Sequence, residues 1–404
     1  MSYTYSNRIR YEDTSDLDSF GRLRVSSVTS LIELKHVHDN LPLLVDQKVS
    51  GVGASATWSF ANSQVAMAVT NNNEYVIRQT RSRGIYQPGK GQIMEASFGN
   101  FALQTNVIKR VGYFSATTVA PYNSGFDGYF LESDGQTGVI SFQIWKNGTL
   151  TYSSPSTSWL TEDYDASLLV WTDTQLMVTD FQWLGVGRVR FGMVIDGTFR
   201  LFTVHTGTNN LTEVYMRSPN QPVRYEIRSV GGAGTFNMIC SQVSLEGSIN
   251  NLQQSSAING FNQITCGVAG TYPLLGYRLN SGYVGANITL SDVQSLIGTS
   301  GTDCFFTIQL NPTLSGALAF SNITNTPIDY ALGNGTVTVT AAGTTIAAFL
   351  GSGSAAQVDN FEFKDNVLRP GIGIDGTQTE VWLCATTTAN NVKLRSSANL
   401  SFFI

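Results

Sequence analysis

Residues 179–205 read TDFQWLGVGRVRFGMVIDGTFRLFTVH and alternate short apolar runs with turn-forming residues. Three of these runs have the length and composition of β-strands, at 179–183, 186–195 and 199–205. Asp196-Gly197 separates the second run from the third, and this dipeptide favours the two-residue turn of a β-hairpin. The stretch therefore predicts consecutive antiparallel strands.

The same pattern extends through the amino-terminal part of the chain. Further strands are predicted at 57–60, 64–69, 75–80, 92–98, 107–114, 139–145 and 223–229. A second hairpin turn is predicted at Asn147-Gly148, and this part contains no long amphipathic helix. Short strands at this spacing predict an all-β fold, an antiparallel β-sandwich of jelly-roll or lectin-like type.

Composition divides the chain into three parts. Residues 1–28 are polar and lack apolar periodicity, which predicts an extended anchoring arm that orders against a partner, or else a disordered tail. The small polar residues 247–260 mark the boundary between a large β-sandwich domain at 29–250 and a smaller β-rich domain at 251–404. In the smaller domain we expect strands at 305–310, 336–340, 345–349 and 381–385, and short helices at 291–297 and 355–368.

Chemically reactive side chains are scarce. The 404 residues include 3 His and 4 Cys, and 13% are charged, whereas catalysis and metal binding draw mainly on His, Cys and clustered carboxylates. The formal net charge of −5 argues against general nucleic-acid affinity. The amino terminus lacks the apolar region of a signal peptide, and no apolar run is long enough to span a membrane. These features favour a soluble, non-enzymatic structural or binding protein without a cofactor or metal.

Two groups of residues could bind a metal ion, but each pattern also occurs in proteins without one. His36 and His38 would point the same way on a strand, as two metal ligands or as common strand histidines. Glu162, Asp163 and Asp165 form the densest acidic cluster, which indicates either a solvated loop or a calcium site. The sequence predicts no metal site.

The remaining histidine and the cysteines are expected to be structural. His205 is alone on an apolar strand. No two cysteines have C-x-x-C spacing, so we interpret all four as small buried hydrophobic residues, with a Cys240–Cys266 bridge left open. Trp159 follows a Ser/Thr-rich loop (SSPSTSWL) and is predicted to lie at the surface, where it could bind a glycan or anchor an interface.

Several motifs resemble one known family when they are taken together. They are DSFGRLRVS (18–26), YQPGK (86–90), KRVGYF (109–114), DFQWLGVGRVRFGMVID (180–196), VYMRSPNQPVRYEI (214–227), RLNSGYVGA (278–286), QLNP (309–312) and GIGIDG (371–376). The combination resembles a widespread family of virion structural proteins, found mostly in tailed bacteriophages and also in some large DNA viruses. The resemblance covers nearly the whole chain and implies a virion component, with no catalytic residues to transfer.

Two of these motifs supply the candidate assembly residues, which are Phe20, Arg22, Leu23, Arg24, Arg188 and Arg190. Phe20 and Leu23 would dock on a neighbour, and the first two arginines would pair with acids. The other two arginines share one strand face, where they would pair with Asp180 or Glu226 of this sandwich, or with a neighbouring subunit.

The sequence therefore predicts a non-enzymatic virion structural protein of a tailed bacteriophage, assembled in the host cytoplasm. It would form a homo-oligomer, a trimer or a ring, through its arm and its sandwich surfaces. Its place would be the capsid surface, as a decoration, minor capsid or head-fibre protein, or else the collar, tail or baseplate. The alternative is a receptor- or glycan-binding module of the virion with a lectin-like sandwich. A glycan depolymerase would require two carboxylates about 5–10 Å apart across a cleft.

Overall fold

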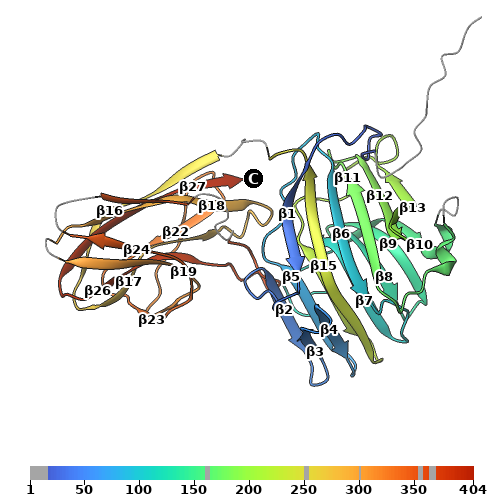
Figure 1. Cartoon of the computed structure of the whole chain (residues 1–404), viewed down its shortest axis with the longest axis horizontal. Coiled ribbons are helices and arrows are strands. Elements are labelled where there is room, and N and C mark those ends of the chain that lie inside the picture. The colour runs from blue at the N-terminus through green and yellow to red at the C-terminus, as the bar shows by residue number, and fades with distance from the viewer. Residues whose placement is uncertain (1–16, 160–163, 250–253, 300–301, 354–357, 364–369) are drawn as a thin grey trace, which may run out of the picture. The chain divides into compact units, whose positions relative to one another are not determined.

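The computed structural model describes residues 17–159, 164–249, 254–299, 302–353, 358–363 and 370–404. The chain forms two compact units, one of residues 1–80 with 86–250 and one of residues 81–85 with 251–404 (Figure 1). Nearly all regular structure is antiparallel β, and the main sheets of the first unit form a sandwich. The predicted all-β fold class is confirmed.

The first unit consists of two large sheets. The first sheet has the order β13-β12-β11-β6-β15-β4-β3 with β1 beside β15, and contains β1 (Val28–Lys35), β3 (Ser55–Ser59), β4 (Gln64–Val69), β6 (Gln92–Gly99), β11 (Gln175–Phe181), β12 (Arg188–Ile195), β13 (Thr198–Thr206) and β15 (Gly234–Glu246). The second sheet has the order β10-β9-β8-β7-β14-β5-β2, and contains β2 (Val45–Ser50), β5 (Tyr75–Thr80), β7 (Val107–Ser115), β8 (Asp127–Asp134), β9 (Val139–Lys146), β10 (Thr149–Pro155) and β14 (Val223–Ser229). Two short 3-10 helices follow β10, namely η1 (Ser156–Ser158) and η2 (Ala166–Leu168).

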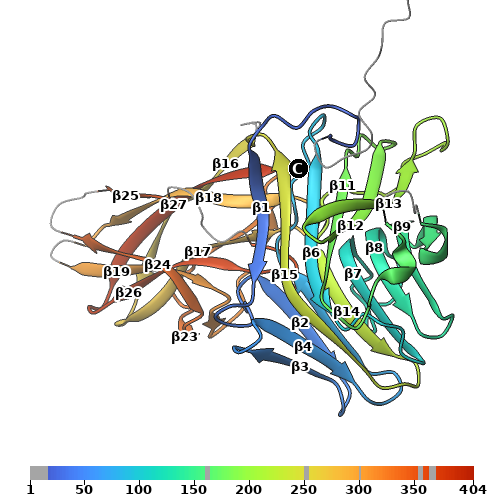
Figure 2. The same ribbon diagram turned by 45° about the vertical axis from the view of Figure 1, so that its right-hand side comes forward.

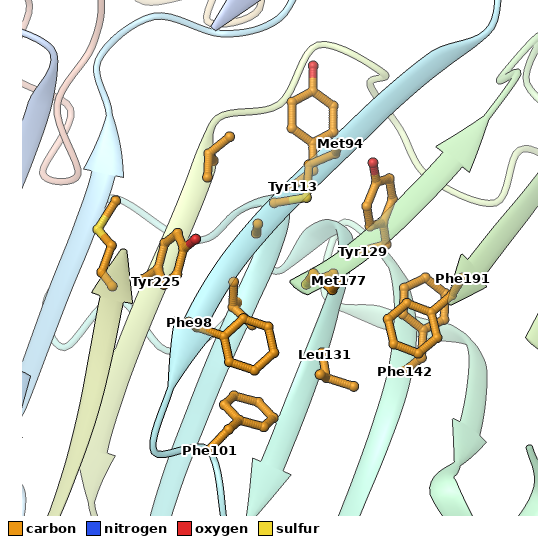
Figure 3. Close-up of a cluster of buried hydrophobic side chains, with 14 of the residues drawn as sticks. Met94, Phe98, Phe101, Tyr113, Tyr129, Leu131, Phe142, Met177, Phe191 and Tyr225 are labelled. Atoms are coloured by element: carbon orange, nitrogen blue, oxygen red, sulfur yellow. The ribbon is translucent and has the colours of Figure 1, made fainter. Parts of the chain in front are cut away.

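The two sheets enclose an aromatic core. Met94 and Phe98 of the first sheet and Tyr113 of the second lie within it, all fully buried (Figure 3). Phe142 of β9 stacks on Phe191 of β12 with ring centroids 4.6 Å apart, so this contact joins the two layers. Burial of large aromatic side chains between the layers is the main stabilising contribution expected for such a sandwich.

Both predicted hairpin turns are present. Asn147 and Gly148 have φ of 45° and 87°, and Asp196 and Gly197 have φ of 52° and 74°. Positive φ at both central residues fits the twist of the flanking strands, and Asn, Asp and Gly adopt it at low cost. These turns join β9 to β10 and β12 to β13.

The second unit contains two principal sheets and a two-stranded ribbon. One sheet has the order β16-β27-β18-β25, built from β16 (Gln254–Cys266), β18 (Asn287–Ile297), β25 (Val358–Glu362) and β27 (Val392–Phe403). The other has the order β21-β22-β17-β26-β19-β24, built from β17 (Gly270–Leu279), β19 (Asp303–Leu310), β21 (Ser321–Asn322), β22 (Ile328–Leu332), β24 (Thr344–Ser352) and β26 (Val381–Thr387). The ribbon pairs β20 (Thr313–Leu314) with β23 (Val339–Ala341).

The two helices predicted in this unit are wrong where the structure describes them. Residues 291–297 belong to β18, and residues 358–362 form β25, while 355–357 and 364–368 lie outside the described residues. A β-bulge between Leu290 and Asp292 explains the first error. The bulge places buried Leu290 and Val293 three residues apart, and the buried residue between Val293 and Ile297 is the polar Ser295, so the apolar residues have the three- and four-residue spacing of a helix.

Charged side chains cover the outer face of β14 yet are buried. Arg224 and Glu226 are each 1% exposed, because loop 116–126 lies over them. The loop accepts hydrogen bonds from the strand: Arg224 Nη2 donates to Tyr122 O (2.9 Å) and Arg228 Nη2 donates to Pro121 O (2.6 Å). The polar face of this sheet is therefore part of the interior.

The burial of Lys109 in β7 should make the stability of the protein depend on pH. The Lys109 side chain is fully buried, with Nζ donating to the carbonyls of Asn100 (2.5 Å) and Ala102 (3.0 Å). Burial lowers the pKa of Lys109 from 10.5 to about 7. The unfolded chain therefore binds more protons between these values, so the free energy of unfolding should rise from pH 7 toward pH 10, by at most ~1.4 kcal/mol per pH unit.

Urea denaturation of the natural protein and of Lys109→Met at pH 7 and pH 9 measures this effect. The stability of the natural protein relative to the variant should increase with pH. An unchanged difference would contradict the lowered pKa.

Candidate functional site: an amino-terminal clasp

Residues 17–24 fold against the first sheet of their own chain, and we call this segment the clasp (Figure 2). Its core is a tight turn in which Leu17 pairs with Leu23, and Gly21 has a φ of 76°. The carboxylate of Asp18 accepts hydrogen bonds from the amides of Phe20 (2.9 Å) and Arg22 (2.8 Å). It also pairs with Arg22 Nε at 2.5 Å, so one buried acid organises the whole turn.

Asp180 of β11 fixes the clasp to the sheet. It lies directly opposite Arg190 of β12 in the strand register, and Arg190 Nε donates to it at 3.1 Å. Ser19 Oγ of the clasp donates to the other carboxylate oxygen at 2.8 Å, and Arg24 also pairs with Asp180. Ser19 and Asp180 are 161 residues apart, so this contact joins the two motifs quoted above at one buried carboxylate.

Further contacts extend the attachment to neighbouring positions. Gln182 Nε2 donates to Asp18 at 2.7 Å, and Arg24 Nε lies 3.3 Å from a carboxylate oxygen of Glu246 at the end of β15. The carbonyl of Leu17 accepts from both Arg24 and Arg190. The clasp is thus held by residues of β12, of β11 and the position after it, and of the end of β15.

The electrostatics of the clasp are balanced. Among the described residues, the ion pairs of the clasp join three carboxylates to three guanidinium groups, those of Asp18, Asp180 and Glu246 with Arg22, Arg24 and Arg190. Burial acts to raise the pKa of Asp18, but the hydrogen bonds and the charge of Arg22 outweigh it, so this pKa is lowered. Burial raises the pKa of Glu246 despite the charge of Arg24. The buried charges are neutralised in place, as buried ions require.

Two apolar residues of the clasp and the valine that follows it are exposed. Phe20 is 45% exposed, Leu23 54% and Val25 89%, whereas Leu17 of the clasp is buried. A groove of about 410 Å³ adjoins Phe20 and is lined by Ser19, Phe20, Gly21, Arg188, Thr206 and Thr208. The clasp therefore presents apolar side chains and an adjacent hollow on one face of the first unit.

The structure brings together all six candidate assembly residues. Arg22, Arg24 and Arg190 pair with acids of their own chain, and Arg188 donates to the carbonyl of Ser19 at 3.5 Å. Of the two acids considered, Asp180 pairs with Arg190, whereas Glu226 pairs with Arg110 and Arg224 of the second sheet. The arm was expected to order against a partner; its residues 17–24 order against their own sandwich, and residues 1–16 lie outside the described residues.

The surface position predicted for Trp159 is wrong. Its side chain is 4% exposed and stacks on Phe202 with ring centroids 4.9 Å apart. Its indole nitrogen donates to Ser154 O at 3.1 Å. The short helix η1 leaves Thr157 and Ser158 in water and is followed directly by Trp159, whose side chain enters the core.

The possible metal ligands do not converge where the structure describes them. His36 is buried and its Nδ1 is hydrogen-bonded to Ile239 O (2.7 Å), whereas His38 is exposed. Glu162 and Asp163 lie outside the described residues, and Asp165 accepts from the amide of Ser167, which caps η2. Within the described part of the chain, no three His, Cys, Asp or Glu side chains are grouped to hold a metal ion.

The residues expected to be structural are mostly buried. His205 is 6% exposed beside the rings of Tyr152 and Tyr215, and burial lowers its pKa to about 4. All four cysteines are free thiols, so the Cys240–Cys266 bridge is absent, and three of them are buried. Among the described residues, no helix has the length and hydropathy to cross a membrane.

No protein-family model and no curated protein matches this chain. Among solved structures, a Bacillus licheniformis β-glucanase aligns with 10% identity over 55% of this chain and 99% of the glucanase, with a TM-score of 0.34. The exoplasmic/lumenal domain of VIP36, in a Ca²⁺/Man3GlcNAc-bound form, aligns with 13% identity over 55% of this chain and 92% of that chain (TM-score 0.35). A legume lectin-like domain from Entamoeba histolytica aligns with 8% identity over 54% and 98% (TM-score 0.33).

Proposed function

We propose that this chain is a non-enzymatic structural protein of a tailed-bacteriophage virion, in which the clasp holds the amino-terminal arm at a fixed place on the sandwich. The observation that carries the proposal is the contact of Ser19, Arg24 and Arg190 with Asp180. The two motifs on which the family resemblance chiefly rests meet there. Their polar residues serve attachment, which is the role expected of an assembly motif.

The exposed apolar residues of the clasp, and Val25 beside it, support assembly through this segment. Phe20, Leu23 and Val25 lie within six consecutive residues, and each is close to half exposed or more. Contiguous exposed apolar side chains rimmed by charge are typical of protein–protein contacts. We propose a homo-oligomer, a trimer or a ring, placed on the capsid surface or in the collar, tail or baseplate.

Replacing Phe20 and Leu23 with serine should abolish self-association. Both side chains are already in water, so the variant should keep its fold while it loses apolar contact area. Light scattering at low micromolar concentration measures the oligomeric state. Val52→Ser is the matched control, because Val52 is fully exposed outside the clasp, and it should leave the oligomer unchanged.

The virion role has its own test. Antibodies against the protein should label purified particles of the phage that encodes it, at one repeated position in electron micrographs. Particles that lack the protein would overturn the proposal. Labelled particles together with glycan binding by the Phe20→Ser/Leu23→Ser variant would instead favour the receptor- or glycan-binding module.

A further inference from the structure

A groove runs across the outer face of the first sheet, beside the clasp. It consists of two hollows of about 280 Å³ each, which share Glu95 of β6. The hollow next to the clasp is lined by the ion-paired Arg24, Asp180 and Arg190 and by apolar side chains, those of Ile93, Val178, Val194 and Phe199. The other hollow continues toward β1 and β15 and is lined in part by Leu176, Ser97, Cys240 and Gln242.

Glu95 is the distinctive residue of this groove. It is partly buried between the two hollows, and among the described residues its carboxylate has no hydrogen-bond or ion-pair partner. Burial raises the pKa of Glu95, although the charge of Arg24 acts to lower it. A carboxylate held out of water without a partner is unfavourable, so a cation that entered the groove would be bound by it.

The groove fits a peptide that alternates basic and apolar residues. The apolar side chains that line it are aliphatic apart from the ring of Phe199, whereas sugars are usually held by flat aromatic faces. The chain itself contains such a segment, Arg8-Ile9-Arg10-Tyr11. This segment precedes Leu17 by six to nine residues, which an extended chain spans over about 20–30 Å.

We infer that the groove receives residues 8–11 of a second copy of the chain, with Arg8 or Arg10 paired to Glu95. This inference rests on the proposed assembly through the arm and names the surface that the arm occupies. Phe20, Leu23 and Val25 lie within four residues of Arg24, which lines the groove, so a second copy bound at the groove would also bury exposed apolar side chains. Burial of these exposed apolar side chains therefore favours contact with a second copy of the chain over contact of the arm with its own sandwich.

A charge-reversal pair of full-length proteins tests the inference. Glu95→Lys alone should not self-associate, because its groove repels the basic segment 8–11, and Arg8→Glu/Arg10→Glu alone should fail because its segment repels Glu95. Mixed in equal amounts, the two variants should associate, since each arm then meets a groove of opposite charge. Light scattering and capture of one tagged variant by the other measure the association. Each variant alone should associate at least tenfold more weakly than the natural protein, and the mixture should recover association by at least tenfold.

The outcomes separate the groove from the proposed function. Glu213→Lys, a charge reversal at an exposed residue outside the groove, should self-associate like the natural protein. Variants that retain natural self-association, or a mixture that stays monomeric, would overturn the trans groove contact while leaving the virion role standing. A natural protein that is itself monomeric would overturn both the groove contact and the proposed homo-oligomer. Thermal unfolding at unchanged temperature confirms that each variant is folded.

Discussion

Asp180→Asn is expected to lower the free energy of unfolding by about 3–5 kcal/mol. Asp180 neutralises two guanidinium groups, and that of Arg190 is 1% exposed. An asparagine keeps the shape of the side chain but removes the negative charge that faces both arginines, while Arg24 keeps its contact with Glu246 at 3.3 Å. Removing one partner of a buried ion pair costs much more than the pair itself contributes, because the remaining charge stays out of water.

Urea denaturation at pH 7 measures this change, and trypsin provides a local readout. Arg24 is protected in the natural protein, with 17% of its side chain exposed, so cleavage after Arg24 should accelerate in the variant. Glu213→Gln is the control, because Glu213 is 72% exposed and its pair with Lys146 should contribute less than about 1 kcal/mol. A variant as stable as this control would contradict the role given to Asp180.

Glu226→Gln is expected to have a similar effect on the second sheet, about 3–5 kcal/mol. Glu226 is 1% exposed and accepts from Arg110 Nη1 (2.5 Å) and from Arg224 Nη2 (2.6 Å). Burial acts to raise its pKa, but the charges of Arg224 and Arg110 dominate and lower it from 4.5 to about 2. A lowered pKa means that the ionised carboxylate stabilises the fold above pH 4.5 and loses this contribution as the pH falls toward 2.

Denaturation at pH 7 and at pH 3 therefore tests two features of Glu226. The natural protein should exceed the variant in stability at pH 7, and the difference should shrink at pH 3. Glu132→Gln is the matched control, since Glu132 also pairs with Arg110 but is 12% exposed and faces fewer arginines. Equal losses for the two variants would show that burial of Glu226 does not set the cost.

The fold could be predicted from the sequence where local chemistry decides it. Both hairpin turns follow from Asn-Gly and Asp-Gly, and the alternating runs around them fix strands such as β12 and β13. The pairing of Asp180 with Arg190 was among the predicted alternatives, because both lie on adjacent strand segments of one motif. The candidate site could be predicted only in part. The motifs identified the six candidate assembly residues, but nothing in the local sequence indicates the contacts that Ser19, Gln182 and Glu246 make.

Tertiary structure decided which polar residues are inside. The stretch VRYEIRS of β14 alternates apolar and charged residues, which by itself describes a strand with one face in water. All seven residues are buried, because a loop more than 90 positions earlier in the chain covers the charged face and accepts its hydrogen bonds. The burial of Trp159 and the attachment of the clasp likewise depend on residues that are distant in the sequence. The sequence by itself determined the strands, the turns and the all-β class, since these depend on neighbouring residues. Burial depends on what packs across from each strand, and only the folded chain decides that.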